Sequence, residues 1–211
     1  MASPRGNQSP IEFWFSIGST YTYLTVMRIG EVAATTGISF RWRPFDVRAI
    51  MLEMNNIPFS TKPVKARYMW RDVERRAAMY GIPWAAIPPY PLKDLSLPNR
   101  VALVGCEEGW CAAYVTAAYR RWFIGRKDVS GEPNISTSLR EIGQDPDRVL
   151  AIADSERLKI LLNGQTDTAR GLEIFGAPSF VVGDELFWGD DRLEDAIAWR
   201  QSGSLAKSPA N

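Results

Sequence analysis

The sequence predicts an α/β protein in which the strands of one sheet come from both ends of the chain. Three observations carry this prediction: residues 11–45 read as strand, helix, strand; residues 99–173 read as helices; and residues 179–199 read as strand, strand, helix. A strand, a helix and a second strand in close succession form a βαβ unit, whose two strands pair in parallel. We therefore expect residues near 11–46 and 174–200 to share one sheet, although more than 120 residues lie between them.

The first unit begins with an aromatic and β-branched run, Ile11 to Ile17 (IEFWFSI), which is typical of a buried strand. Gly18-Ser19-Thr20 ends this run. Apolar residues then recur at helical spacing from Tyr23 onward, until Gly37 stops the pattern. A second strand is expected over Ser39–Phe45.

The middle of the chain is predicted to be mainly helical. Residues Lys62 to Tyr80 form a heavily charged helical pattern, and the five prolines between Pro83 and Pro98 predict a surface loop after it. Helices are expected to resume at about 99–126, 135–152 and 154–173.

The strand signal returns near the end of the sequence. Ser179–Val182 and Glu185–Trp188 flank Gly183-Asp184, a composition typical of a hairpin, and Asp190-Asp191 opens a final helix through Trp199. The fold class is therefore α/β with segregated helices.

This order of elements divides the chain. We expect a sheet domain of residues 11–46 plus 174–203, a mainly helical insertion of residues 47–173, and flexible termini at 1–10 and 204–211.

Composition argues against several classes of partner. Basic and acidic residues are balanced, 25 against 24, and no run of Lys or Arg suggests a nucleic-acid-binding face. The longest apolar stretches fall short of the ~20 residues that a membrane helix needs. The N-terminal segment MASPRGNQSP lacks the apolar core of a secretory signal. We therefore expect no nucleic-acid partner, no membrane association and a cytoplasmic location.

Two further absences narrow the chemistry. The sequence has no histidine, which excludes serine–histidine triads, imidazole acid–base catalysis and most zinc sites. Its two cysteines, Cys106 and Cys111, are five residues apart and do not form the C-x-x-C of a redox pair. We interpret them as buried thiols in a helical region and expect no metal site.

Ser19 lies where the first strand is expected to meet the first helix. Free backbone N–H groups and the helix dipole favour an anion at such a junction, and a hydroxyl there can donate a hydrogen bond to that anion. Serine is also a common N-cap residue. The local sequence therefore leaves a binding role and a capping role open.

The segment around Ser19, FSIGSTYTYL (Phe15–Leu24), resembles the F-D-F-x-S-P-Y-S-Y-L segment of the 2-hydroxychromene-2-carboxylate isomerases and kappa-class glutathione transferases. Three further segments are similar in the same order: NNIPFSTKPVKARYMWRDVER, FGAPSFVV and ELFWGDDRLED. The resemblance extends over residues 11–200. It implies the DsbA-like branch of the thioredoxin fold, in which a helical insertion interrupts the sheet domain.

The resemblance assigns a role to Ser19 and to two residues of the second segment. Ser19 would replace the first cysteine of a C-x-x-C motif and donate a hydrogen bond to the thiolate of bound glutathione. Asn56 would lie near glutathione, and Lys65 would offer a cation to one of its carboxylates. A turn asparagine and a solvated helix lysine are the alternatives. Thr20 departs from the proline that usually follows this serine.

The last two segments imply further contacts with glutathione. The Ala177-Pro178 bond is expected to be cis, so that the backbone of Ala177 faces Ser19 and pairs with a peptide-like ligand; a simple strand-entry proline is the alternative. Asp190 and Asp191 lie in a segment that resembles the one that binds the γ-glutamyl end of glutathione. Asp191 matches that segment closely, whereas Asp190 departs from it and adds a negative charge. Helix capping is the alternative role for both aspartates.

The function implied is that of a glutathione-dependent isomerase in aromatic catabolism, which interconverts 2-hydroxychromene-2-carboxylate and trans-o-hydroxybenzylidenepyruvate. A glutathione thiolate would add to a conjugated carbon, allow bond rotation and leave. The resemblance also implies a homodimer. One alternative is a kappa-class-like glutathione transferase. The other is a non-catalytic binding protein that retains the fold, and Thr20 and Asp190 favour this second alternative. The missing C-x-x-C argues against a thiol–disulfide oxidoreductase.

Overall fold

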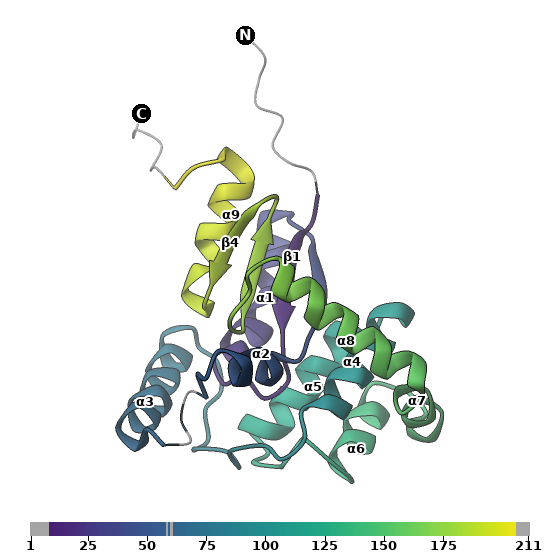
Figure 1. The fold of residues 1–211 in the computed structure, drawn as a ribbon. Coiled ribbons are helices and arrows are strands. Elements are labelled where there is room, and N and C mark those ends of the chain that lie inside the picture. Colours follow the sequence, from purple (N-terminus) through teal and green to yellow (C-terminus); the bar gives the residue numbers. More distant parts are fainter. Residues whose placement is uncertain (1–8, 58, 60, 206–211) are drawn as a thin grey trace.

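Four strands form one mixed sheet in the order β2-β1-β3-β4 (Figure 1). The computed structural model describes residues 9–57, 59 and 61–205. Strand β1 pairs in parallel with β2 and antiparallel with β3, and β3 pairs antiparallel with β4. The prediction that the two ends of the chain share one sheet is confirmed. The strands are β1 (Ile11–Phe15), β2 (Phe40–Pro44), β3 (Ser179–Val182) and β4 (Glu185–Trp188).

Helices occupy most of the chain between β2 and β3. The described helices are α1 (Thr22–Thr36), α2 (Val47–Glu53), α3 (Pro63–Met79), α4 (Ser96–Glu108), α5 (Cys111–Phe123), α6 (Asn134–Glu141), α7 (Pro146–Ala153), α8 (Glu156–Gly171) and α9 (Leu193–Ser202), with a short 3₁₀ turn η1 (Asp190–Arg192) before α9.

Two long helices expected in the insertion are each divided, so these two predictions were wrong. Gly109 has a φ of 87° and its N–H donates to the carbonyl of Gly105, which ends α4 and separates it from α5. Gly143, with a φ of 74°, lies between α6 and α7, and Asp145 caps α7 just before Pro146. The helix α2 was not predicted at all; the Asp46 side chain caps it by accepting hydrogen bonds from two backbone N–H groups.

Other local predictions are confirmed. The helix α1 ends at Gly37, whose φ of 68° is the left-handed conformation that favours glycine. The hairpin turns at Gly183, which has a φ of 62°. The first strand is shorter than expected, because it ends at Phe15, two residues before the end of the apolar run at Ile17.

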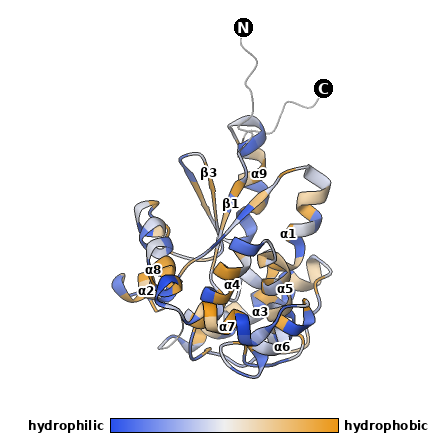
Figure 2. Cartoon of the chain, turned by 90° about the vertical axis from the view of Figure 1, so that its right-hand side faces the viewer, coloured by the Kyte–Doolittle hydropathy of each residue, from blue (hydrophilic) through white to orange (hydrophobic). Residues whose placement is uncertain are grey.

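The two central strands, β1 and β3, bury side chains on both faces of the sheet. Successive side chains along a strand point to opposite faces. Phe13 and Phe15 of β1 pack with residues of α1, α4, α5 and α9, whereas Trp14 packs on the opposite face with residues of α2 and α8. Figure 2 shows the hydrophobic residues concentrated on β1, β3 and α4. The larger core is continuous from the sheet into the insertion helices. The division of the chain into two domains stays a prediction.

Most of the termini predicted to be flexible, residues 1–10 and 204–211, lies outside the described residues. Within the described ranges, none of the helices combines the length and the apolar character required to cross a membrane.

Candidate functional site

Ser19 lies in the loop that joins β1 to α1, at the end of the sheet where β3 begins. Its side chain is half-buried, and its hydroxyl donates a hydrogen bond of 2.7 Å to the carbonyl oxygen of Ala177. The helix α1 begins only at Thr22, and its N-cap residue, Tyr21, makes no side-chain capping bond. The hydroxyl of Ser19 therefore does not serve as a simple helix cap.

Ala177 and Pro178 form the opposite wall of this contact. The peptide bond between them is cis, as predicted, and the Ala177 carbonyl faces Ser19. The Pro178 carbonyl accepts a hydrogen bond of 2.9 Å from the N–H of Gly189, so the loop before β3 is also tied to the end of β4. The fold thereby brings together two predicted site residues that are 158 positions apart in the sequence.

Asn99 of α4 contacts the loop from the side of the insertion. Its Oδ1 accepts a 2.8 Å hydrogen bond from the Ile17 N–H. Its Nδ2 donates to Ser16 Oγ at 3.1 Å and to the carbonyl of Leu95 at 2.6 Å. Asn99 is fully buried, so these bonds satisfy an amide that has no access to water.

Tyr119 of α5 contacts the same loop with its hydroxyl. The oxygen lies 3.1 Å from the carbonyl oxygen of Ser16 and 3.0 Å from that of Ser19, so one O–H is shared between two acceptors. The Ser16 carbonyl also accepts a 3.0 Å bond from the N–H of Ser19. Burial raises the pKa of Tyr119, so its hydroxyl keeps the proton that it donates.

Gly18 gives the loop its sharp turn. Its φ of 115° lies in a region that side chains rarely adopt, and a Cβ at this position would lie 2.4 Å from Leu95 Cδ2. The turn and the close approach of Leu95 both therefore require glycine.

We expect Gly18→Ala to destabilise the protein by about 1–3 kcal/mol, because alanine would be strained in this conformation and would displace Leu95. Urea unfolding measures the change. Gly30→Ala is the matched control, since Gly30 lies within α1 with no positive φ and nothing within 4 Å of the added Cβ. Equal stability of the two variants would contradict the prediction.

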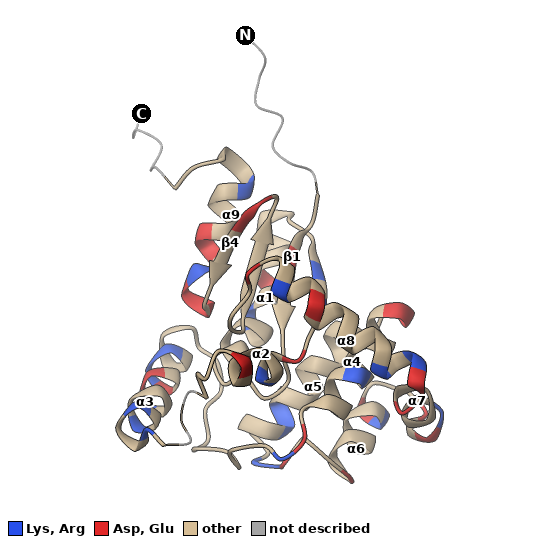
Figure 3. Ribbon diagram, in the orientation of Figure 1, with Lys and Arg blue, Asp and Glu red and all other residues tan. Residues whose placement is uncertain are grey.

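A chain of polar and charged side chains connects α3 with the start of α1 and with η1. The Tyr21 hydroxyl donates to Asp72 Oδ2 at 3.0 Å, and Arg76 Nε donates to the same oxygen at 3.2 Å. Arg76 also lies 3.9 Å from Asp191 Oδ2. Burial opposes ionisation of Asp72, but its hydrogen bonds from Tyr21 and Arg76 hold its pKa below the ordinary value. Figure 3 shows positive and negative residues interspersed along α3.

Asp190 is buried and paired, in contrast to the exposed Asp191. Its Oδ1 accepts hydrogen bonds from Thr25 Oγ1 at 2.8 Å and from Arg28 Nε at 3.1 Å. Burial raises the pKa of Asp190, and the charge of Arg28 opposes that rise. Neither η1 nor α9 has a side-chain cap, so the two aspartates do not cap the final helix through their side chains. The contact of Asp190 with glutathione stays a prediction, although its carboxylate is buried inside the protein.

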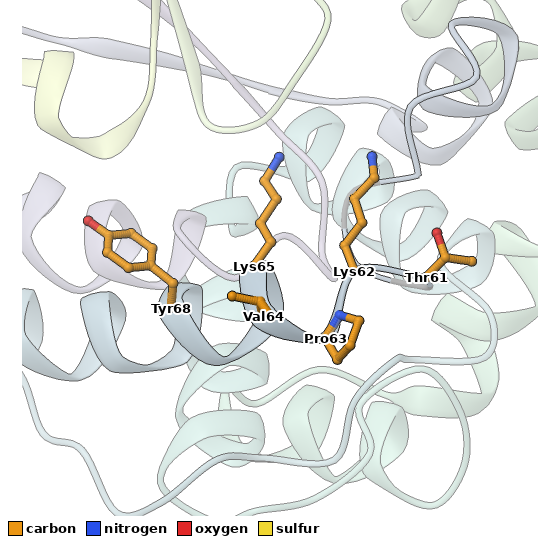
Figure 4. Close-up of a pocket in the computed structure, with 6 residues that line it drawn as sticks. All are labelled: Thr61, Lys62, Pro63, Val64, Lys65 and Tyr68. Atoms are coloured by element: carbon orange, nitrogen blue, oxygen red, sulfur yellow. The ribbon is translucent and has the colours of Figure 1, made fainter.

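Lys65 lies on an open hollow at the N-terminal end of α3. The hollow has a volume of about 650 Å³. Figure 4 shows the side chains of Lys62 and Lys65 side by side, with both ammonium groups directed away from α3 on the same side. Within the described part of the chain, no carboxylate forms an ion pair with either lysine. The lining residues are Thr61, Lys62, Pro63, Val64, Lys65 and Tyr68.

Asn56 lies in the turn that ends α2. Its N–H donates to the carbonyl of Met51 at 2.8 Å, and the preceding Asn55 has a φ of 50°. The backbone of Asn56 therefore has the turn role given as its alternative. Its side chain is exposed, and its contact with glutathione stays a prediction.

The two cysteines have no disulfide bond. Burial raises the pKa of the Cys111 thiol well above its ordinary value, which keeps it protonated and weakly nucleophilic at neutral pH. Across the residues that the structure describes, no three His, Cys, Asp or Glu side chains gather in a group able to hold a metal ion.

The site thus joins some predicted residues and leaves others apart. Ser19 contacts Ala177, and Asp191 lies 3.9 Å from Arg76, in the last turn of α3, whereas Lys65 lies in the first turn of that helix. No contact among the described residues joins Asn56 or Lys65 to Ser19. Sequence reasoning missed Asn99, Tyr119 and Lys62. Asn99 had a signal, because an amide among the apolar residues of α4 needs buried partners; nothing in the sequence separated Tyr119 from other buried tyrosines.

Comparison with known proteins gives a consistent result. The DSBA-like thioredoxin domain pattern matches residues 10–197. The 2-hydroxychromene-2-carboxylate isomerase of Sphingobium xenophagum is 30% identical over 187 residues, which cover 87% of this chain and 94% of that protein. Glutathione S-transferase kappa 2 of Caenorhabditis elegans is 23% identical over 201 residues and 89% of each chain.

A solved structure supports the same relationship. It is a 2-hydroxychromene-2-carboxylate isomerase that superposes with a TM-score of 0.81 at 25% identity, and the match covers 94% of this chain and 100% of that one. Because the domain pattern and the isomerase relative both extend over most of the sequence, the chain belongs to the DSBA-like thioredoxin-domain family and, within it, to the group of enzymes that includes the 2-hydroxychromene-2-carboxylate isomerases and kappa-class glutathione transferases.

Proposed function

We propose that the protein is a glutathione-dependent isomerase of the 2-hydroxychromene-2-carboxylate isomerase type, with Ser19 as the residue that holds the thiolate. One observation carries the proposal. The hydroxyl of Ser19, not a thiol, lies at the strand–helix junction against the carbonyl of Ala177, 2.7 Å away. Such a hydroxyl cannot form a disulfide, but it can stabilise a sulfur anion by hydrogen bonding.

Glutathione carries charged groups at both of its ends, and these groups need partners of opposite charge on the protein. One of its two carboxylates would pair with Lys62 and Lys65, which line the same hollow without a carboxylate partner among the described residues. The α-ammonium of glutathione needs an anionic partner. The carboxylate of Asp191, whose side chain is 42% exposed, would supply it. These residues would hold the two ends of the peptide, with Ser19 toward the sulfur.

Bound glutathione supplies a nucleophilic thiolate, whose reversible addition to a conjugated carbon permits bond rotation. The contribution of the protein begins with an exchange of partners. The Ser19 hydroxyl turns from the Ala177 carbonyl to the sulfur, and the carbonyl accepts a hydrogen bond from a ligand N–H in its place. The exchange leaves no polar group unpaired, so it costs little free energy.

The first experiment combines binding and turnover. Calorimetric titration with glutathione is expected to show saturable binding, and 2-hydroxychromene-2-carboxylate is expected to isomerise only when glutathione is present. Absence of binding would favour the alternative of a non-catalytic protein that retains the fold. Isomerisation at the same rate without glutathione would contradict the proposed cofactor.

We expect Lys65→Met to weaken glutathione binding about tenfold, since an exposed charge-assisted hydrogen bond contributes near the lower end of about 1.5–3 kcal/mol. Lys159→Met is the matched control. Lys159 lies on α8, on the side of the molecule opposite α3 (Figure 1), and pairs with Asp154. The dissociation constant for glutathione is measured calorimetrically. Equal affinity of the two variants would remove Lys65 from the site.

A kappa-class-like transferase is the second candidate, favoured by the similarity to glutathione S-transferase kappa 2. The two reactions differ in the fate of glutathione, which a transferase consumes and an isomerase returns. Quantifying free thiol during turnover separates them. The homodimer and the role in aromatic catabolism stay predictions from the resemblance, and the cytoplasmic location stays a prediction from the sequence composition. Light scattering of the purified protein tests the dimer.

A further inference from the structure

The position of Ser19 depends on a short loop that has little regular structure of its own. The loop leaves the sheet after Phe15 and enters α1 at Thr22. Between them, one backbone bond from the Ser19 N–H to the Ser16 carbonyl spans the turn, and the carbonyls of Thr20 and Tyr21 accept bonds from the first turn of α1. A single bond of this kind leaves a loop free to open on its own, so the remaining restraints on Ser19 come from other elements.

In addition to the bond between the Ser19 hydroxyl and the Ala177 carbonyl, the helical insertion supplies restraints through two fully buried side chains. Asn99 accepts a hydrogen bond from the N–H of Ile17 and donates one to Ser16 Oγ. Tyr119 donates to the carbonyls of Ser16 and of Ser19 itself. Both side chains are 0% exposed, so packing fixes their own positions.

We infer that Asn99 and Tyr119 are positioning residues, which hold the backbone of Ser19 so that its hydroxyl meets the sulfur of bound glutathione. The inference rests on the proposed function of Ser19. It assigns to the helical insertion a direct part in the chemistry of the sheet domain, because both residues belong to insertion helices and neither needs to touch the ligand. A hydrogen-bond donor displaced by a fraction of an ångström still permits binding, but it stabilises the thiolate less.

Tyr119→Phe removes one oxygen and is the first test. The pKa of the bound glutathione thiol, measured by ultraviolet difference spectra of the binary complex, is expected to rise by about one unit or less, and the glutathione dissociation constant is expected to change less than about threefold. The rise of kcat with pH is expected to shift upward by the same amount. A residue that only supports the fold would lower stability without moving the thiol pKa.

Tyr114→Phe is the matched control. Tyr114 lies on the same helix and is equally buried, but its hydroxyl has no hydrogen-bond partner among the described residues. The control is expected to leave the thiol pKa and the pH profile unchanged. If Tyr119→Phe and Tyr114→Phe give the same thiol pKa, Tyr119 does not position Ser19 and the inference is overturned for this residue.

Asn99 is tested without glutathione, by amide hydrogen exchange. In Asn99→Ala the N–H of Ile17 loses its acceptor, so its exchange is expected to accelerate about tenfold or more, relative to the strand amide of Phe13. Unchanged exchange would overturn the role of Asn99. If Asn99→Ala does not fold, Asn99→Asp, which keeps the Oδ1 acceptor, is expected to retain slow exchange at Ile17 while losing the bond to the Leu95 carbonyl; fast exchange in this variant would overturn the role.

These outcomes separate the inference from the proposed function. If Ser19→Ala raises the thiol pKa and Tyr119→Phe does not, only the positioning role falls. If Ser19→Ala leaves the thiol pKa unchanged, or if the wild-type protein does not bind glutathione, the proposed function falls and the inference falls with it.

Discussion

Replacing Ser19 with alanine is expected to raise the pKa of the bound glutathione thiol by about one to two units and to slow turnover at neutral pH. A hydrogen bond to a charged acceptor is worth about 1.5–3 kcal/mol net, and each pKa unit corresponds to about 1.4 kcal/mol. The variant loses a donor that stabilises the thiolate relative to the thiol. At pH values above the raised pKa, the thiol ionises without help, and the rate is expected to recover in part.

Ultraviolet difference spectra of the complex, recorded against pH, follow the thiolate directly. Ser138→Ala is the matched control, because Ser138 is a buried serine of α6 whose hydroxyl bonds to its own helix. The fold of Ser19→Ala is expected to be intact, since the lost bond joins a half-buried hydroxyl to one carbonyl. An unchanged thiol titration together with an unchanged rate would show that Ser19 does not stabilise the bound thiolate.

Ser19→Cys is the informative companion. A thiolate at this position can attack glutathione disulfide, so that one glutathione leaves as a thiolate and the other forms a mixed disulfide with residue 19. Mass spectrometry detects the adduct. The substitution therefore tests whether the site brings a glutathione sulfur next to the side chain of residue 19, even where catalysis is lost.

Patterns local to the chain predicted the sheet domain well. The aromatic strand, the helix that ends at Gly37 and the hairpin around Gly183 each depend on residues that are close to one another in the sequence. The contact between Ser19 and the carbonyl of Ala177 was reached differently, from motifs similar to those of a known family. Composition and periodicity alone do not bring these two residues together.

The insertion was harder to predict because apolar periodicity continues through its helix ends. The helix predicted over residues 99–126 includes Gly109, although a glycine there permits the left-handed cap that divides α4 from α5. The missed helix α2 did carry a start signal in Asp46. In both cases the residue type is compatible with two structures, and the apolar pattern alone does not choose between them.

The two neighbouring aspartates show where sequence reasoning ends. Asp190 and Asp191 have the same side chain and adjacent positions, yet one is 2% exposed and bonded to Arg28, whereas the other lies at the surface beside Arg76. The partner of Asp190 lies 162 residues away in the sequence. Only the packing of α1 against η1 distinguishes the two roles.

This buried pair leads to the largest stability effect that we expect. Arg28→Met should destabilise the protein by about 3–5 kcal/mol at neutral pH, because it leaves the Asp190 carboxylate buried without its cation. The side chains of Arg28 and Asp190 are only 9% and 1% exposed, so solvent screens their interaction little. Glu194, at 60% exposed, also loses its partner but remains hydrated. Urea unfolding at pH 7 measures the loss.

The pH dependence identifies the cause of that loss. Burial already raises the pKa of Asp190, and the charge and hydrogen bond of Arg28 oppose the rise, so Arg28→Met should raise this pKa further. A carboxyl whose pKa is higher in the folded than in the unfolded state favours folding at low pH, and this contribution disappears as the pH rises through the folded pKa. The deficit of Arg28→Met should therefore shrink from pH 7 to pH 5, by up to about 1.4 kcal/mol per pH unit.

The double variant Arg28→Met/Asp190→Asn completes the argument. An amide carries no charge to desolvate, so the double variant should regain much of the stability that Arg28→Met loses at pH 7 and should lose the extra pH dependence. If instead the double variant is as unstable as Arg28→Met at both pH values, the cost comes from lost packing of the Arg28 side chain over the Tyr80 ring, 4.4 Å away, and not from the unpaired charge.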